Sequence, residues 1–96
     1  MADFWQRNDD KEVTLGLSAD AQEKFGAIKF VDLPVVGTTL TVGETFMAVE
    51  AEKAVLDLES PVTGEVIAVN TAASEAPALL NSAQQSDNWV VTVKSA

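Results

Sequence analysis

The chain contains one ten-residue pattern twice, and this repeat constrains its fold more than any other feature. Residues 34–43 read PVVGTTLTVG and residues 61–70 read PVTGEVIAVN, at an offset of 27 residues. Pro, Val, Gly and a second Val recur at matching positions, and Leu40 matches Ile67. Internal repeats of this kind set the architecture of a fold. We therefore expect a small β domain whose two halves are related by a pseudo-twofold axis.

The pattern of short elements predicts a mainly β fold. Ser18 is a suitable cap for a helix over residues 19–25, which Gly26 would end. Pro77 can begin a short helical turn, residues 8–11 read as a turn, and residues 81–88 have the composition of a polar loop. Strand patterns cover residues 12–17, 27–31, 38–42, 45–51, 54–58, 63–69 and 89–93. Together they predict a flattened barrel or sandwich of two small antiparallel sheets, with one or two short helices.

Two further expectations follow from residue types. Gly43 and its repeat partner Asn70 both tolerate left-handed backbone, which suggests that both copies end in the same conformation. Aromatic side chains bury large areas in a small protein, so we expect them to pack in or against the core. These aromatic residues are Trp5, Phe25, Phe30, Phe46 and Trp89.

Size and charge limit the classes of function. A chain of 96 residues has the length of one domain, so we assign residues 1–96 to it. The net charge is −9, from 15 acidic against 6 basic residues. Phosphate backbones and anionic membranes repel such a surface, so we expect neither a nucleic-acid nor a membrane partner. No apolar run reaches membrane-spanning length and the start has no secretory pattern, so the cytoplasm is the expected compartment.

The chain has neither cysteine nor histidine. This composition removes disulfides, Cys/His metal sites, thiol nucleophiles and the usual general base. We therefore predict no metal site. Any redox or acyl chemistry would need a reactive group brought in from outside.

Lys53 lies at the expected tip of the hairpin between residues 45–51 and 54–58. It is near the midpoint of the duplication, so twofold packing would place it at an apex, with the termini at the opposite end. Its neighbours Glu52 and Ala54 leave the amine little obstructed, as an enzyme that modifies the amine would require. An ordinary solvated lysine at a turn is the alternative, and periodicity alone favours it.

Acidic residues crowd this hairpin. One reading is solubilising charge, since exposed ion pairs contribute little to stability. A second reading is a recognition surface for a modifying enzyme or for other partners. In that reading the acidic residues and Ala54 together surround the lysine. A third reading is a pair of catalytic carboxylates for glycoside hydrolysis, but so short a chain shows no evident cleft for a substrate. The acidic residues are Glu50, Glu52, Asp57 and Glu59.

The chain resembles the biotinyl/lipoyl domain family, and within it the H proteins of the glycine cleavage system. The resemblance extends in order from Val13 to Trp89. Its segments are residues 13–26, 30–37 (FVDLPVVG), 43–44, 49–50, 53–54, 60–66 (SPVTGEV), 69–70 and 80–81. It implies the barrel-sandwich hybrid fold and lipoate in amide linkage on Lys53. Biotin is disfavoured, because biotin carriers usually place Met on both sides of the lysine.

The resemblance also implies partners and a function, that of a carrier component of a multienzyme system and not of an enzyme. A lipoate ligase or lipoyltransferase would attach the arm to Lys53. The arm would then carry an aminomethyl group and reducing equivalents between glycine decarboxylase, a folate-dependent aminomethyltransferase and dihydrolipoyl dehydrogenase. Because the arm is covalently attached, it presents its load to each partner enzyme at a high local concentration. A groove near the hairpin is expected to shelter the loaded arm, and Glu12, Asp32 and the helix after Ser18 are candidates for it by analogy.

Two departures from the H proteins leave alternatives open. Ala51-Glu52 precedes the lysine where H proteins usually have a Ser-Val pair, and residues 84–88 (QQSDN) replace the usual aromatic and glycine residues. These changes leave the lipoyl site intact and fall on segments that could take part in docking to glycine decarboxylase. The alternatives are an H-like relay that donates lipoyl groups to other proteins or serves in a stress-related modification operon, a lipoyl domain of a dehydrogenase complex, and an interaction module whose Lys53 stays unmodified.

Overall fold

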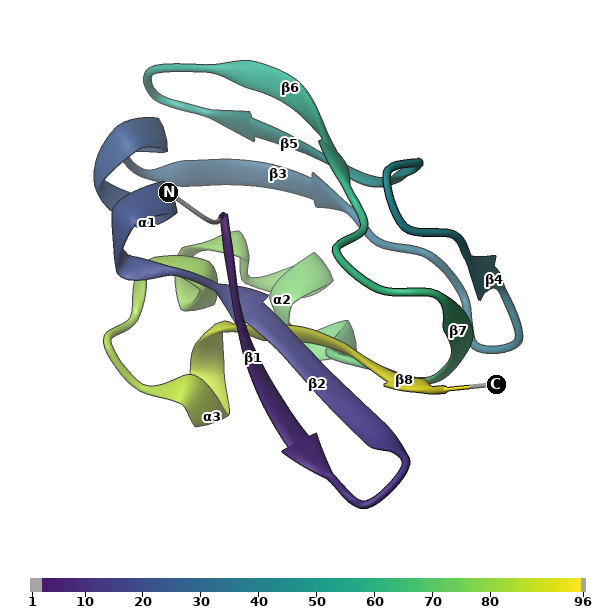
Figure 1. Ribbon diagram of the computed structural model, residues 1–96. Coiled ribbons are helices and arrows are strands. Elements are labelled where there is room, and N and C mark those ends of the chain that lie inside the picture. The colour runs from purple at the N-terminus through teal and green to yellow at the C-terminus, as the bar shows by residue number, and fades with distance from the viewer. Residues whose placement is uncertain (1–2, 96) are drawn as a thin grey trace.

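Two antiparallel β-sheets and four short helices make up residues 3–95, the part of the chain that a computed structural model describes (Figure 1). The five-stranded sheet has the order β1-β2-β8-β7-β4, and the three-stranded sheet the order β3-β5-β6. The strands are β1 Phe4–Asp9, β2 Glu12–Leu17, β3 Ile28–Asp32, β4 Thr39–Leu40, β5 Thr45–Ala51, β6 Val55–Glu59, β7 Gly64–Val69 and β8 Trp89–Lys94. The helices are α1 Ala19–Phe25, α2 Thr71–Glu75, the 3₁₀-helix η1 Pro77–Asn81 and α3 Gln85–Asn88. This architecture confirms the predicted mainly β fold of two small antiparallel sheets.

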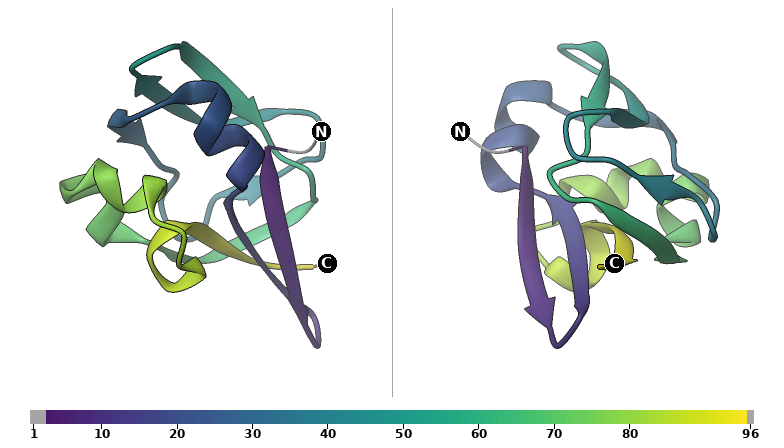
Figure 2. Two further views of the ribbon diagram at one scale, coloured as in Figure 1. Left: turned by 90° about the vertical axis from the view of Figure 1, so that its left-hand side faces the viewer. Right: turned by 45° about the vertical axis from the view of Figure 1, so that its right-hand side comes forward.

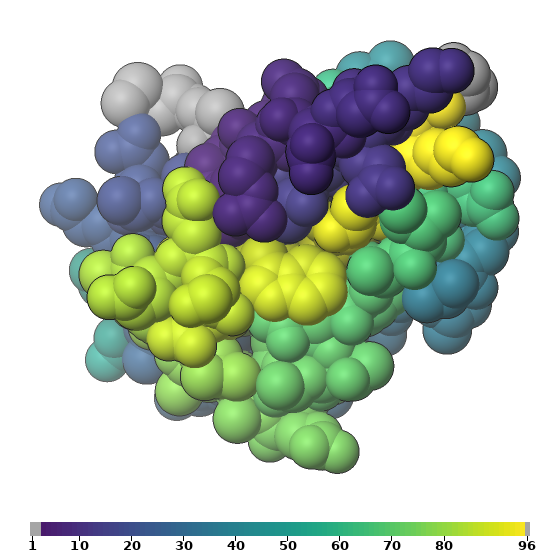
Figure 3. Space-filling view, turned by 90° about the horizontal axis from the view of Figure 1, so that it is seen from below, coloured from purple at the N-terminus to yellow at the C-terminus, as the bar shows by residue number. Residues whose placement is uncertain are grey.

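The five-stranded sheet joins the two ends of the chain. β8 pairs with β2 on one side, with Glu12 opposite Lys94, and with β7 on the other. Seen from below, the yellow C-terminal strand lies between the purple N-terminal strands and green β7 (Figure 3). The central position of β8 therefore depends on residues from both ends of the sequence.

β1 corrects the prediction for the start of the chain. Residues 8–11 were expected to form a turn, but β1 runs to Asp9 and the turn consists of Asp10 and Lys11. Asp10 takes the left-handed conformation there, with φ 57°. The indole of Trp5 lies directly over Gly16, where a Cβ would collide with it, and its Nε1 donates to Asn88 Oδ1 at 2.7 Å. These tertiary contacts stabilise β1, whose mostly polar sequence does not predict a strand.

α1 covers one end of the space between the sheets (Figure 2). Its bounds agree with the predicted residues 19–25, and Ser18 caps it as expected, accepting a hydrogen bond from Ala21 N at 3.1 Å. Ala21 and Phe25 are buried on its inner face. Burial of a side chain as large as Phe25 contributes roughly 1.5–3 kcal/mol. Gly26 ends the helix with φ 76°, a value that favours glycine.

The two copies of the repeat lie side by side. β4 pairs antiparallel with β7, with Thr39 opposite Glu65 and Leu40 opposite Gly64. β4 is shorter than the predicted strand over residues 38–42. The expected match between Gly43 and Asn70 is wrong, because φ is 87° at Gly43 and −78° at Asn70. The pseudo-twofold relation of the whole halves stays a prediction.

Asn70 has a different role from the one that the repeat suggested. Its side chain is buried, and Nδ2 donates to Asp87 O at 3.1 Å and to Trp89 O at 2.9 Å. A buried amide must find such partners, because leaving it unpaired costs free energy. The asparagine therefore fixes the junction between α3 and β8. Its backbone conformation suits these hydrogen bonds and differs from that of its repeat partner Gly43.

The segment before β8 holds more helix than predicted. The turn after Pro77 is confirmed as η1, but α2 was not expected and α3 lies inside the predicted polar loop. Ser82 stabilises α3, since its Oγ accepts from Gln84 N at 3.0 Å and donates to Asp87 Oδ2 at 2.8 Å. Helices this short depend on such local side-chain bonds and on packing.

Phe30 is the aromatic residue that departs from expectation. Phe25 is buried, and Trp5, Phe46 and Trp89 are half-buried, as predicted. Phe30 is 56% exposed. A bulge between Ile28 and Phe30 shifts the register of β3, so that Phe30 lies opposite Glu50 on the outer face of the sheet.

Candidate functional site

The β5–β6 hairpin places Lys53 at its tip. Glu50 lies opposite Val55, and Ala51 N donates to Ala54 O at 2.8 Å across the turn. β5 has its predicted bounds, and β6 begins one residue later than predicted. Lys53 is exposed, and its Nζ lies 3.5 Å from Glu23 O near the C-terminal end of α1. The amine is therefore accessible to a reagent or an enzyme.

The tip is held by backbone bonds to the segment after α1. Lys53 N donates to Phe25 O and Glu52 N donates to Ala27 O, both at 2.9 Å. The lysine therefore extends from a fixed position of the main chain, and its Nζ donates a long hydrogen bond to Glu23 O. Asp3 also lies at this end, since it accepts from Lys24 Nζ at 3.0 Å. The expectation that both termini lie opposite the tip therefore fits only the C-terminal strand (Figure 1).

Asn81 supports this arrangement from the second half of the chain. Its Oδ1 accepts from Ile28 N at 2.7 Å and its Nδ2 donates to Gly26 O at 2.9 Å. The amide thus fixes the segment whose carbonyl groups receive the bonds from the tip. Asn81 was expected in a polar loop, so this role was not predicted. No local pattern in the sequence marks this role, because the two bonds reach residues 53 and 55 positions away.

The structure brings only some of the acidic residues to the lysine. Glu50, Glu52, Asp57 and Glu59 are all exposed. Glu52 lies at the tip against Gly26, and Glu50 is on the outer face of β5. Glu59 pairs with Thr45 at the far end of the hairpin. It is six positions from Lys53, or about 20 Å at the usual rise of a strand.

Ala54 and Asp57 are the remaining residues of the recognition surface predicted around Lys53. Ala54 is half-buried and packs against the core, so it leaves the space beside the amine open. Asp57 is on β6, between the tip and Glu59. Among residues 3–95, the one ion pair is Lys24 with Asp3, and none of the four acids forms one with Lys53.

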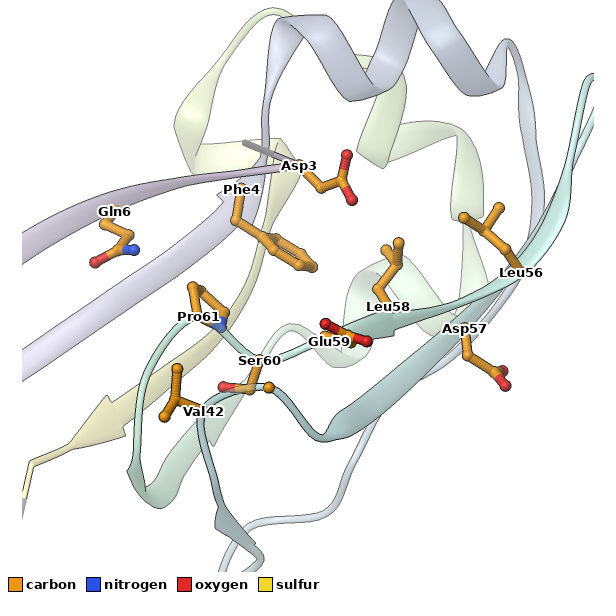
Figure 4. Close-up of a pocket in the computed structure, with 11 residues that line it drawn as sticks. Asp3, Phe4, Gln6, Val42, Leu56, Asp57, Leu58, Glu59, Ser60 and Pro61 are labelled. Carbon is orange, nitrogen blue, oxygen red and sulfur yellow. The ribbon is translucent and has the colours of Figure 1, made fainter. Parts of the chain in front are cut away.

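A cavity of about 430 Å³ runs along β6, starting close to the tip. Figure 4 shows Phe4 and Leu58 pointing toward one another across it, with Leu56 on the same side and Asp57 pointing away. Asp3 and Glu59 add carboxylates to its wall. Neither Glu12 nor α1 lines this cavity, and Asp32 lines a neighbouring one of about 290 Å³. The groove residues suggested by analogy are therefore not those of the cavity beside the hairpin.

Two observations concern metals and membranes. Across residues 3–95, no cluster of three or more acidic side chains is placed to hold a metal ion. In the same part of the chain, each helix is too short or too polar to cross a bilayer. The chemistry that this surface offers is that of an accessible primary amine, three positions before Leu56 in a cavity of mixed apolar and acidic lining.

Comparison with known proteins gives one consistent result. The family profile of the glycine cleavage H-protein matches residues 2–96. Glycine cleavage system H proteins from Psychromonas ingrahamii and Nitratidesulfovibrio vulgaris are 45% and 46% identical, over 93% and 94% of this chain. The match covers 71% of each of these relatives. A mitochondrial glycine cleavage system H protein from Pisum sativum is 40% identical over 94% of the chain, which spans about half (54%) of that relative.

A solved structure extends this result to three dimensions. The crystal structure of a glycine cleavage system H protein from Mycobacterium marinum superposes with a TM-score of 0.89 and 34% identity. The match covers 100% of this chain and 81% of that one. Together with the sequence matches, it confirms the resemblance found in the sequence. The chain belongs to the glycine cleavage H-protein family.

Proposed function

We propose that this protein is a lipoyl carrier of the glycine cleavage system, with the lipoyl group on Nζ of Lys53. Membership of the H-protein family makes the chain a carrier component and not an enzyme, as the resemblance implied. The observation that carries the assignment of the lysine is its geometry. Lys53 is exposed, and two backbone bonds hold its tip in place.

The chain's own residues fit the group. The neutral amine Nζ of Lys53 would form a C–N bond with the carbonyl carbon of a lipoyl group activated as an acyl phosphate. The bond to the activating phosphate would break with its electron pair, and Nζ would lose one proton. When bound, the lipoyl group supplies a dithiolane that can carry an aminomethyl group and electrons. Such chemistry has no other source in a chain without cysteine or histidine.

The cavity along β6 is our candidate for the shelter of the arm. Leu56, Leu58 and Phe4 offer an apolar surface to a hydrocarbon chain, and Asp3 and Glu59 offer carboxylates to a cationic amine. Leu56 follows Lys53 by only three positions. Exclusion of water would protect a reactive load on the arm.

The partners and the compartment belong to the same proposal. A lipoate ligase or lipoyltransferase would modify Lys53, and glycine decarboxylase, an aminomethyltransferase and dihydrolipoyl dehydrogenase would use the arm. The family and its bacterial members support these partners. We expect residues 1–96 to act as one domain in the cytoplasm, which cell fractionation would test. The comparisons do not favour a lipoate relay or an unmodified interaction module.

Intact mass spectrometry tests the attachment. The protein is incubated with lipoate, ATP and a lipoate ligase. We expect one lipoyl mass increment in the wild type and none in Lys53→Arg, because a guanidinium does not accept the acyl group. Lys29→Arg is the matched control, since Lys29 is also an exposed lysine of the same sheet. An increment that persists in Lys53→Arg would refute Lys53 as the site.

A second assay tests the glycine cleavage role. Glycine–bicarbonate exchange is measured with glycine decarboxylase and the lipoylated protein. We expect exchange with the wild type and none with Lys53→Arg. If the lipoylated wild type supports no exchange, the carrier assignment survives but its place in glycine cleavage does not.

A further inference from the structure

β1 forms one wall of the cavity along β6. Phe4 and Gln6 of β1 line this cavity, together with Asp3, which directly precedes the strand. Figure 4 shows the ring of Phe4 directed across the cavity toward Leu58. β1 and β6 belong to different sheets, and each lies at the edge of its own sheet. The width of the cavity therefore depends on where β1 lies, because the strand ladders within residues 3–95 do not join β1 to β6.

Phe4 gives this wall an apolar contact with the three-stranded sheet. Its side chain is 6% exposed, and its ring centroid lies 5.4 Å from that of Phe46 on β5. Tilted aromatic pairs at such a separation are favourable. The rest of β1 from Gln6 to Asp9 is exposed. The position of the wall is therefore the position of the Phe4 ring.

Trp5 anchors β1 from its opposite face. Successive side chains of a strand point to opposite faces, so Trp5 points away from the cavity that Phe4 lines. The indole lies over Gly16 of the neighbouring strand β2, where a Cβ would collide with it. Its Nε1 donates a hydrogen bond of 2.7 Å to Asn88 Oδ1. Neither Trp5 nor Asn88 lines the cavity along β6.

Asn88 is itself fixed in place as the acceptor of this bond. Its side chain is 4% exposed, and its Nδ2 donates to Ser82 O at 2.9 Å. Loss of the indole donor would leave a buried acceptor without its partner, which is unfavourable. The bond therefore ties β1 to the segment before β8, 83 positions away in the sequence.

The other contacts of β1 determine its distance from β6 less directly. Asp3 O accepts from Ser18 N at 2.9 Å, and the ladder with β2 continues to Asp9. The ion pair of Asp3 with Lys24 is exposed on the lysine side, and exposed ion pairs contribute little. A ladder on one side sets the register of an edge strand but lets it twist and bend. A side-chain anchor then decides how close Phe4 lies to the second sheet.

We propose that Trp5 is a positioning residue for the attached arm: through Asn88, it fixes Phe4 as the wall that keeps water from the load. The proposal rests on the proposed function and adds two residues that lie outside the cavity. Without the bond, β1 moves outward and admits water, although the residues that line the cavity are unchanged. Exclusion of water is what protects a reactive group in such a site.

Hydrolysis of a loaded arm measures this shelter. The reduced lipoyl protein is loaded with formaldehyde and ammonia, which place an aminomethyl group on one sulfur and release one water. Hydrolysis breaks the carbon–sulfur bond, consumes one water and returns the thiol, formaldehyde and ammonium. Intact mass follows the loss of the group after the free reagents are removed. Because the chain has no cysteine, this sulfur chemistry reports on the arm alone.

Three variants change the anchor or the wall. Trp5→Phe keeps an aromatic ring and removes the N–H donor. Asn88→Ser removes the acceptor from the other end, and it keeps the test valid if Trp5→Phe folds poorly. Phe4→Leu changes the wall itself. Trp89→Phe is the matched control, since Trp89 is a half-buried indole of the same sheet and does not line this cavity.

We expect Trp5→Phe and Asn88→Ser to speed hydrolysis about fivefold, the factor that corresponds to the loss of one hydrogen bond. Trp89→Phe should match the wild type. In the unmodified protein, NMR should show weaker NOEs between the rings of Phe4 and Phe46 in the same two anchor variants. A loss of global stability alone changes neither readout, because circular dichroism confirms that each variant is folded under the conditions of the assay.

The route through Phe4 is tested by the double variant Trp5→Phe/Phe4→Leu. If Trp5 acts by positioning Phe4, Trp5→Phe should add less than about twofold to the effect of Phe4→Leu, because coupled residues are not additive. Effects that multiply in the double variant would show that Trp5 acts by another route and would overturn the proposal.

Three further outcomes count against it. Hydrolysis rates within about twofold of wild type for both anchor variants, or unchanged NOEs between Phe4 and Phe46, would overturn the positioning role. A loaded wild-type arm that hydrolyses as fast as loaded free lipoamide would overturn the shelter in this cavity. A wild type that gains no lipoyl mass would refute the proposed function itself, and this result is distinct from the others.

Discussion

Gly26 is the residue at which a single methyl group should disturb the lysine tip. Its φ is 76°, and a Cβ built there would lie 2.8 Å from Glu52 Oε1 and 3.4 Å from Lys53 Cγ. We expect Gly26→Ala to lower the free energy of unfolding by about 1–2 kcal/mol, because alanine is strained in left-handed backbone. It should also slow lipoylation, because both tip side chains must move. Urea unfolding and the rate of mass gain measure the two effects.

Gly43→Ala separates these two effects. Its φ is 87°, so the strain is comparable, but nothing lies within 4 Å of the added Cβ. We expect a similar loss of stability with no change in the lipoylation rate. Equal lipoylation rates for the two variants would contradict the idea that contact with Gly26 positions the tip.

Asn81 links the elements around the site and gives a prediction at their scale. Asn81→Ala removes the partners of Ile28 N and Gly26 O. An unsatisfied backbone group costs about 1–3 kcal/mol, so the protein should lose stability of that order. The amides of Glu52 and Lys53 should then exchange with solvent faster relative to the amides of β8, because their acceptors lie in the released segment.

Hydrogen exchange followed by NMR measures this change. Asn8→Ala is the control, since Asn8 is an exposed asparagine of the edge strand β1. Unchanged protection of Glu52 and Lys53, relative to β8, would show that the tip keeps its place without Asn81.

The elements that the sequence predicted well are those with local signals. β2 alternates in hydrophobicity and α1 has both Ser18 as a cap and Gly26 as a stop, and both have the predicted bounds. β1 and α3 have no such signals. β1 depends on Trp5 bonding to Asn88, and α3 on the side chain of Ser82. Their formation is decided by contacts that a local pattern does not contain.

The candidate site divides in the same way. Lys53 could be placed at a hairpin tip, because the strands on both sides and the duplication were visible in the sequence. The support from Asn81 could not, because its bonds span 53 and 55 residues. The exposure of Phe30 follows from a bulge in β3, which no residue type in that strand marks.

At the scale of the whole molecule, the dimensions support one domain. The radius of gyration is 12.1 Å. A compact domain of this length is expected near about 12.5 Å, a value close to the one found. One cluster of buried residues includes Leu15 and Val91 of the five-stranded sheet together with Val31, Val49 and Leu58 of the three-stranded sheet. The two sheets therefore share their apolar contacts.

This shared core predicts one cooperative unfolding transition in urea, since neither sheet can keep its apolar face covered alone. Trp5 and Trp89 are both in the five-stranded sheet, so their fluorescence reports on that half. The NMR signal of Val49 reports on the other half. We expect both transitions to coincide with the loss of circular dichroism, as two-state unfolding requires. If Val49 unfolded at a lower urea concentration than the tryptophans, the hairpin that carries Lys53 would be a separate unit, and its rigidity could not come from the common core.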